Sequence, residues 1–273
     1  SEEINRRWIT EGIRPERLFE EGCVTLEQVR ALGSKTGIPP YEITRSCLAY
    51  ADMWIGDYNY VFQPSSAKLL EEQQGFVPER TILIVDEAHN LPARVASSLS
   101  PCFDDGATAR LRLELRELGT FRELDKLLGE WSQLLSTLRS GDLLALDVVY
   151  EATDLLEQFS EILTVHSLPY DKLTTESFSL LWEYSRAYNL LEDGALRQMW
   201  APDDGQLEIA CLDASKHIEE CLSSFGLKVL TSATLEPIKE FAKECGLCSD
   251  SYEVTNGEAP WKEGAYKVAV DAR

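Results

Sequence analysis

Two carboxylates and an imidazole follow a short apolar segment in the first third of the chain. Residues 81–85 are rich in Ile, Leu and Val, which predicts a buried strand. Asp86, Glu87 and His89 follow immediately. Because open α/β sheets bind their ligands at the carboxyl ends of their strands, the sequence predicts a functional site at this strand end.

These three side chains suit the hydrolysis of a nucleoside triphosphate. The reaction needs a carboxylate to hold Mg²⁺, usually through water, because magnesium prefers hard oxygen ligands and keeps much of its hydration. It also needs a group that orients or deprotonates the attacking water. We assign the first role to Asp86 and the second to Glu87, and we expect His89 to sense the nucleotide and signal to neighbouring motifs. The alternative is an acidic pair that merely begins a surface loop.

A second short strand, predicted at residues 228–231, ends in small hydroxyl residues. Ser232 and Thr234 follow it, and the order Asp-Glu-Ala-His then Ser-Ala-Thr is the pairing of motifs II and III in superfamily 2 helicases. The two strands should then be neighbours in one mainly parallel sheet, with their carboxyl ends at the same edge. The alternative is that Ser232 and Thr234 only cap a helix that begins at Pro237.

Four ordered segments together resemble the xeroderma pigmentosum D / DinG family of DNA helicases. The resemblance implies an ATP-dependent 5′-to-3′ DNA helicase that acts in DNA repair. It also implies that Ser232 and Thr234 couple the nucleotide site to strand movement through hydrogen bonds to Asp86 or His89. Tyr58, Asn59 and Tyr60 are candidates for nucleic-acid contact, although one or both tyrosines could instead pack into the core. The four segments are residues 56–62, 84–91, 211–213 and 230–235.

The family resemblance implies an α/β fold: a mainly parallel RecA-like sheet of the P-loop NTPase type, here incomplete, with a large all-helical arch insertion. Residues 1–103 would be the first part of motor domain 1, with a remnant of the iron–sulfur region at about 14–50. Residues 104–194 would be the arch domain. Residues 195–273 would be the second part of motor domain 1, ending at the start of motor domain 2.

The periodicity of apolar residues supports this organisation. Spacings of three and four along residues 121–138 and again along 144–162 predict two long amphipathic helices that pack antiparallel. A third helix is predicted within 178–191. A Pro-Asp-Asp-Gly turn predicts a hairpin between the flanking β segments. Further short strands are predicted at 53–56, 196–200, 207–212 and 266–271.

ATP and Mg²⁺ are the cofactors that the resemblance implies for the parent protein. No Gly-x-x-x-x-Gly-Lys-Ser/Thr phosphate loop occurs in the 273 residues, and no second motor domain is recognisable. We therefore expect an internal piece of a longer helicase that is inactive by itself. In family members with an iron–sulfur cluster, a cysteine stands where Pro39 stands here, and only Cys23 and Cys47 precede residue 86. We expect no iron–sulfur cluster and no iron–sulfur ligands.

The pair Cys245 and Cys248 raises a different metal possibility. With His217 and Cys221 it could be written as a zinc-like set. We disfavour zinc because no second Cys-x-x-Cys pair occurs, and because Gly246 fits the end of a helix.

Composition limits the partners of the chain. A net charge of −21 opposes binding to a polyanion, so we expect weak DNA binding by this acidic piece. Single-stranded or forked DNA would be the partner of the parent protein. No apolar run approaches the roughly 18 residues of a membrane span, so we expect no membrane association. Seven cysteines at irregular spacing favour a reducing, cytoplasmic location. The competing function is a non-catalytic module whose arch helices dock a protein while the helicase-like motifs are structural remnants.

Overall fold

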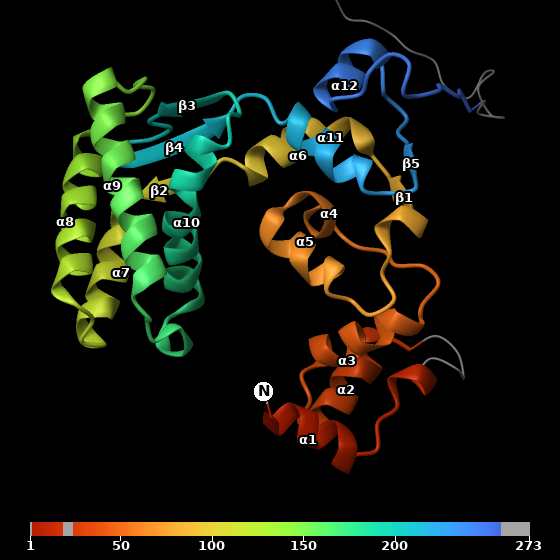
Figure 1. The fold of residues 1–273 in the computed structure, drawn as a ribbon. Helices are drawn as coiled ribbons and strands as arrows, with labels where there is room; N and C mark the ends of the chain where they lie inside the picture. The colour runs from red at the N-terminus through yellow and green to blue at the C-terminus, as the bar shows by residue number, and fades with distance from the viewer. Residues whose placement is uncertain (1, 19–23, 258–273) are drawn as a thin grey trace, which may run out of the picture.

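The computed structural model describes residues 2–18 and 24–257, which form three parts (Figure 1). In that view the N-terminal helices lie at the bottom, a small α/β part lies at the upper right, and a bundle of helices lies at the left. Cys23 and the strand predicted at 266–271 lie outside the described residues.

The N-terminal part consists of short helices that begin at clear sequence signals. Thr25 and Gln28 form a reciprocal capping box, in which Gln28 N donates to Thr25 Oγ1 and Thr25 N donates to Gln28 Oε1. The prediction of a strand at residues 53–56 is wrong, because this stretch pairs with no strand in the described part of the chain. The helices are α1 (Glu2–Thr10), α2 (Leu26–Thr36) and α3 (Pro40–Cys47).

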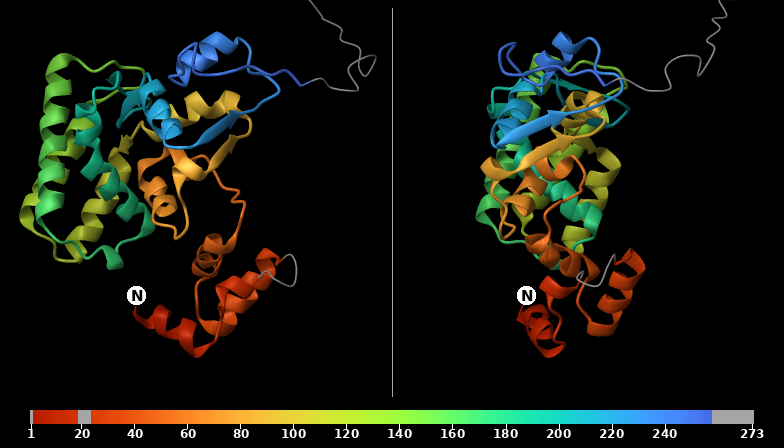
Figure 2. Two further views of the ribbon diagram at one scale, coloured as in Figure 1. Left: turned by 45° about the vertical axis from the view of Figure 1, so that its right-hand side comes forward. Right: turned by 90° about the vertical axis from the view of Figure 1, so that its right-hand side faces the viewer.

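The central part is built on two parallel strands. β1 (Ile82–Val85) pairs with β5 (Leu227–Leu230), and the register runs from Ile82 opposite Leu227 to Val85 opposite Leu230. The two strands lie side by side in both views of Figure 2. The prediction that these strands are parallel neighbours is confirmed, so both motifs leave the sheet at the same edge.

Among the residues that the structure describes, only one face of this parallel pair is covered. Val85 packs in a core with Leu91 of α6 (Leu91–Ser98) and Ile218 of α11 (Ser215–Ser223). Side chains of a strand alternate between two faces, and Ile82 and Ile84 on the other face are 60% and 64% exposed. The prediction of a fully buried strand is therefore wrong for this face. The helices of the central part are α4 (Asn59–Phe62), α5 (Pro64–Glu71), α6 (Leu91–Ser98), α11 (Ser215–Ser223) and α12 (Ile238–Glu244).

The helical bundle has a continuous apolar core of Leu and aromatic residues. Trp131 is fully buried at its centre, with its ring edge-on to the rings of Phe103, Phe159 and Tyr184. The Trp131–Phe159 contact joins the two long helices predicted from their apolar spacing. Among the described residues, no helix is long and apolar enough to cross a membrane. The bundle helices are α7 (Asp105–Glu117), α8 (Arg122–Thr137), α9 (Leu146–Val165) and α10 (Thr175–Glu192).

A small antiparallel sheet closes one end of the bundle. β3 (Arg197–Trp200) and β4 (Gln206–Cys211) form the predicted hairpin, and β2 (Cys102–Asp104) pairs with the other edge of β4. Met199 and Leu207 belong to the same apolar core as the helices. The core of the helical part therefore extends past residue 194, where the predicted arch ends. The division into 1–103, 104–194 and 195–273 stays a prediction.

The bundle joins the central part at the end of α6. The chain enters and leaves the bundle side by side here, because Ile209 N donates to Pro101 O at 3.0 Å. Two arginines of the bundle reach the last carbonyls of α6: Arg186 Nη2 donates to Ser98 O at 3.4 Å and Arg197 Nη1 donates to Leu99 O at 2.7 Å. These bonds satisfy carbonyl groups that a helix end leaves without a partner.

Replacing Trp131 with Ala should lower the free energy of unfolding by about 3–5 kcal/mol, because the change removes a fully buried ring and leaves a cavity. Urea unfolding followed by circular dichroism measures the loss. Trp182→Ala is the matched control, since Trp182 on α10 is 46% exposed and its loss should cost less than about 1 kcal/mol. A loss below about 0.5 kcal/mol for Trp131 would contradict the described core.

Candidate functional site

The ends of β1 and β5 hold the two sequence motifs against each other. Beyond the paired strands, Thr231 N donates to Val85 O at 2.9 Å and Ala88 N donates to Thr231 O at 3.0 Å. His89 Nδ1 then lies 2.7 Å from Ser232 Oγ. The prediction that Ser232 or Thr234 lies within hydrogen-bond range of the Asp86–His89 segment is confirmed.

Ser232 is the centre of a small polar network. Its hydroxyl donates to Glu87 Oε2 at 3.4 Å, which leaves its oxygen free to accept from His89 Nδ1. His89 Nδ1 is also 3.2 Å from Glu87 Oε2. Thr234 joins through its backbone, because Thr234 N donates to Ser232 Oγ at 3.2 Å. At the start of α12 the Ile238 amide donates to Glu236 Oε2 at 3.4 Å, and neither Ser232 nor Thr234 caps the helix.

Glu87 has an unusual backbone conformation. Its φ of 49° makes it the one non-glycine residue with positive φ in the part of the chain that the structure describes. A left-handed backbone costs a non-glycine residue about 1–3 kcal/mol and persists only where its surroundings hold it. Strain of this kind concentrates at functional sites. The backbone therefore gives an independent reason to place function at Glu87.

The side chain of Tyr58 contacts the backbone of this strained turn. Its hydroxyl donates to Asp86 O and lies 3.0 Å from Glu87 O, so one side chain holds both carbonyls. The Tyr58 ring meets Phe62 edge-on, and the guanidinium of Arg94 lies 5.6 Å from the ring centroid. Burial is the main cause that raises the pKa of Tyr58, which keeps the hydroxyl protonated and able to donate. This contact was not foreseen from the sequence.

The other candidate nucleic-acid residues lie on the short helix that Tyr58 precedes. Asn59 begins α4, and its backbone amide donates to Asp57 Oδ1 at 3.1 Å. Tyr60 is 37% exposed, so part of the residue is open to a partner. Of the two tyrosines, Tyr60 is therefore the better placed for stacking on a base.

Asp86 is exposed at the strand end and fits the magnesium role assigned to it. Magnesium takes few protein ligands and is completed by water and phosphate, so one carboxylate at this position suits such an ion. No group of three or more His, Cys, Asp or Glu side chains within residues 2–18 and 24–257 is arranged to hold a metal by itself.

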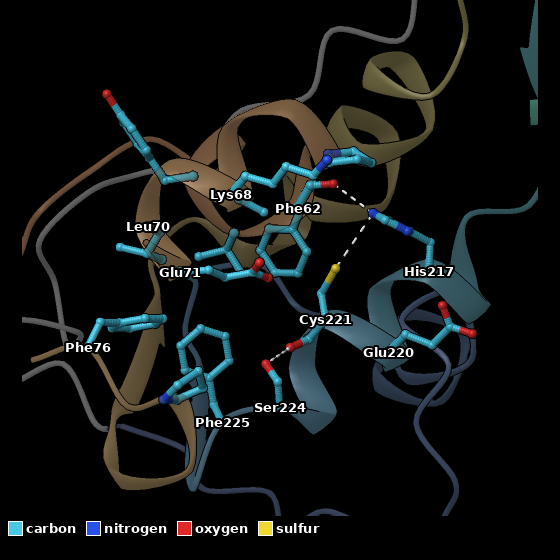
Figure 3. Close-up of a pocket in the computed structure, with 15 residues that line it drawn as sticks. Phe62, Lys68, Leu70, Glu71, Phe76, His217, Glu220, Cys221, Ser224 and Phe225 are labelled. Atoms are coloured by element: carbon cyan, nitrogen blue, oxygen red, sulfur yellow. Dashed lines mark hydrogen bonds between the residues drawn. The ribbon is translucent and has the colours of Figure 1, made fainter. Parts of the chain in front are cut away.

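A cavity of about 350 Å³ lies between α5 and α11, away from this network (Figure 3). His217 and Cys221 point toward each other on its wall, with 3.6 Å between Cys221 Sγ and His217 Nε2. His217 Nε2 is 2.7 Å from Phe62 O, and a carbonyl accepts, so this nitrogen carries the proton and has no lone pair for a metal. Burial raises the pKa of Cys221 to about 11, which keeps the thiol protonated. The hydrogen bond from His217 Nε2 to Phe62 O weighs against the zinc-like set.

In the predicted remnant of the iron–sulfur region, at about residues 14–50, Pro39 and Cys47 have ordinary structural positions. Pro39 is the residue before the first turn of α3. Cys47 is buried, its thiol donates to Pro15 O at 3.7 Å, and burial raises its pKa. Cys23 lies outside the described residues. The absence of an iron–sulfur cluster stays a prediction.

Comparison with known proteins gives consistent matches. The DEAD_2 family model matches residues 6–105. The general transcription and DNA repair factor IIH helicase subunit XPD of Arabidopsis thaliana is 24% identical over 299 residues, or 81% of this chain and 39% of that protein. The XPD/RAD3 subunit of Saccharomyces cerevisiae is 29% identical over 172 residues, or 60% of this chain and 20% of that protein. This chain thus spans about two fifths of the Arabidopsis relative.

Solved structures agree on the fold. A structure named "XPD_Helicase" has a TM-score of 0.58 at 16% identity and covers 81% of this chain and 39% of its own. A structure named "Truncated XPD" has a TM-score of 0.54 at 15% identity and covers 81% of this chain and 62% of its own. At such identity the likeness shows the fold alone, which is α/β and RecA-like with a helical insertion.

Replacing Gly226 with Ala should loosen the contact between the two motifs. Gly226 lies immediately before β5, and a Cβ there would lie 2.2 Å from Glu79 O. The backbone beside β1 must therefore shift. We expect a loss of about 1–3 kcal/mol in the free energy of unfolding, measured by urea unfolding, and faster hydrogen exchange at the Ala88 amide. Gly257→Ala is the control, since a Cβ there meets no atom within 4 Å. Equal behaviour of the two variants would contradict the close approach at Gly226.

Proposed function

We propose that this chain, which resembles XPD/DinG superfamily 2 helicases, is part of an ATP-dependent DNA helicase. In this role it contributes the site where ATP hydrolysis is linked to movement of a DNA strand. The observation that carries the proposal is the 2.7 Å contact between His89 Nδ1 and Ser232 Oγ. This contact joins the strand end that would act on the nucleotide to the motif that would respond to it.

The proposed roles follow the geometry of the strand ends. Asp86 holds Mg²⁺ through water, and the ion would offset negative charge on the phosphates of ATP. Glu87 accepts a hydrogen bond from the attacking water and orients it toward the terminal phosphate. His89 and Ser232 lie beside the Glu87 carboxylate, so a change in its position is passed to Ser232 through the hydrogen bond between them. A shift of Ser232 would in turn reach Thr234, because the backbone amide of Thr234 donates to Ser232 Oγ.

The proposed substrate is single-stranded or forked DNA, unwound in the 5′-to-3′ direction during DNA repair. Asn59 and Tyr60 are the proposed contacts, with the partly exposed Tyr60 stacking on a base. The net charge of −21 means that most phosphate contacts would come from other parts of the protein. The six cysteines within the described residues are free thiols, which supports the proposed reducing, cytoplasmic location. We propose no iron–sulfur cofactor.

A second candidate function is protein docking by the bundle. Phe178 and Trp182 lie one turn apart on α10, and each is 46% exposed. Their exposure favours a binding role for this helix. The full reading frame distinguishes the two functions, because a phosphate loop and a second motor domain elsewhere in it would favour the helicase.

The proposed function predicts that the full-length gene product hydrolyses ATP in a Mg²⁺-dependent manner, and that Glu87→Gln lowers kcat by at least about 100-fold. A phosphate-release assay with and without single-stranded DNA measures the rate. Glu79→Gln, a carboxylate away from both motifs, is the control and should leave the rate near that of the unchanged protein. Equal rates for the unchanged protein and Glu87→Gln would refute the assigned role.

The chain of 273 residues by itself should neither bind ATP tightly nor hydrolyse it, because its sequence contains no phosphate loop to anchor the triphosphate. The same assay on the isolated chain tests this expectation. A Mg²⁺-dependent rate that disappears in Glu87→Gln would contradict it.

A further inference from the structure

The conformation of Glu87 has two supports, one on each side of the turn. On the β5 side, Ala88 N donates to Thr231 O at 3.0 Å. On the other side, the carbonyls of Asp86 and Glu87 share the single proton of the Tyr58 hydroxyl in a three-centre hydrogen bond. The first support is a backbone bond that any residue at position 88 except proline can make. The second depends on a single hydroxyl group.

We propose that Tyr58 is a positioning residue that holds Glu87 in its left-handed backbone conformation and thereby aims its carboxylate. This inference rests on the proposed role of Glu87 in orienting water. The φ of 49° at Glu87 turns the chain sharply after β1, and both carbonyls of the turn point to one oxygen. Without that hydroxyl the turn can relax toward an ordinary negative φ, which would swing the carboxylate away from Ser232.

Two contacts hold the ring of Tyr58 in place, and they thereby set the position of its hydroxyl at the turn. Phe62 meets the ring edge-on with 6.5 Å between centroids, and Arg94 covers it. Arg94 lies on α6, the helix that follows the turn, so Tyr58 contacts both the turn and the helix after it. Replacing the hydroxyl alone should leave these ring contacts intact.

Tyr58 also connects the turn to the proposed DNA contacts. It immediately precedes α4, which carries Asn59 and Tyr60. The backbone NH of Phe62 donates to Tyr58 O at 2.9 Å, so Tyr58 moves with this helix. A nucleic-acid strand that shifts α4 would therefore shift the support under Glu87. The side chain of Tyr58 therefore connects the proposed DNA contacts to the turn that carries the water-orienting carboxylate.

Steady-state kinetics on the full-length gene product test the positioning role. Tyr58→Phe should lower kcat for ATP hydrolysis by about 10- to 100-fold, the range for a misplaced catalytic group, while KM for ATP changes by less than about 3-fold. Tyr41→Phe removes the hydroxyl of a half-exposed tyrosine on α3 and should match the unchanged protein. A Tyr58→Phe enzyme with native kcat, or with a raised KM only, overturns the proposal.

Hydrogen exchange of residues 86–90 separates backbone support from catalysis. Glycine adopts φ of 49° freely, whereas alanine keeps the strain and lacks the carboxylate. Tyr58→Phe should therefore speed exchange in the native and Glu87→Ala backgrounds, but much less in the Glu87→Gly background. Equal effects in the alanine and glycine backgrounds overturn the proposal. An unchanged protein with no Glu87-dependent ATPase activity refutes the proposed function and, with it, the effect of Tyr58 on the reaction. The exchange data then still decide whether Tyr58 holds the backbone at Glu87.

Discussion

The parallel pairing of β1 with β5 is the constraint on which the candidate site depends. Parallel neighbours cannot be joined by a tight hairpin and need a long crossover connection. Here the crossover contains the whole helical bundle, so residues more than 140 positions apart meet at one edge. Four paired residues on each strand set the register, and a slip of one position would turn His89 and Ser232 away from each other.

The site combines strain with a small number of hydrogen bonds that oppose it. A hydrogen bond contributes about 0.5–1.5 kcal/mol net, and left-handed φ at Glu87 costs about 1–3 kcal/mol. The two magnitudes are comparable, so no single bond secures the turn by a wide margin. The backbone bond from Ala88 and the Tyr58 hydroxyl together are enough to offset it. A turn balanced in this way can respond to small changes nearby.

Much of the fold could be predicted because the signals are local. Apolar spacing gave the long helices, a Pro-Asp-Asp-Gly turn gave the β3–β4 hairpin, and strand ends gave the position of Asp86 and Ser232. The rest depends on tertiary packing. Nothing in the spacing of Met199 or Leu207 says that the hairpin packs under the bundle rather than on the parallel pair. Likewise, a tyrosine hydroxyl bound to two carbonyls leaves no pattern in sequence, because any backbone carbonyl can accept.

The attachment of the bundle gives it a mechanical role. The two segments that connect the bundle to the central part lie side by side near the end of α6. Arg186 and Arg197 of the bundle also donate hydrogen bonds to the last carbonyls of α6. α6 has eight residues, roughly 12 Å of helix, and its first turn begins directly after Asn90. Because α6 begins directly after the turn that carries Glu87 and His89, we expect a shift of the bundle to reach this turn through α6.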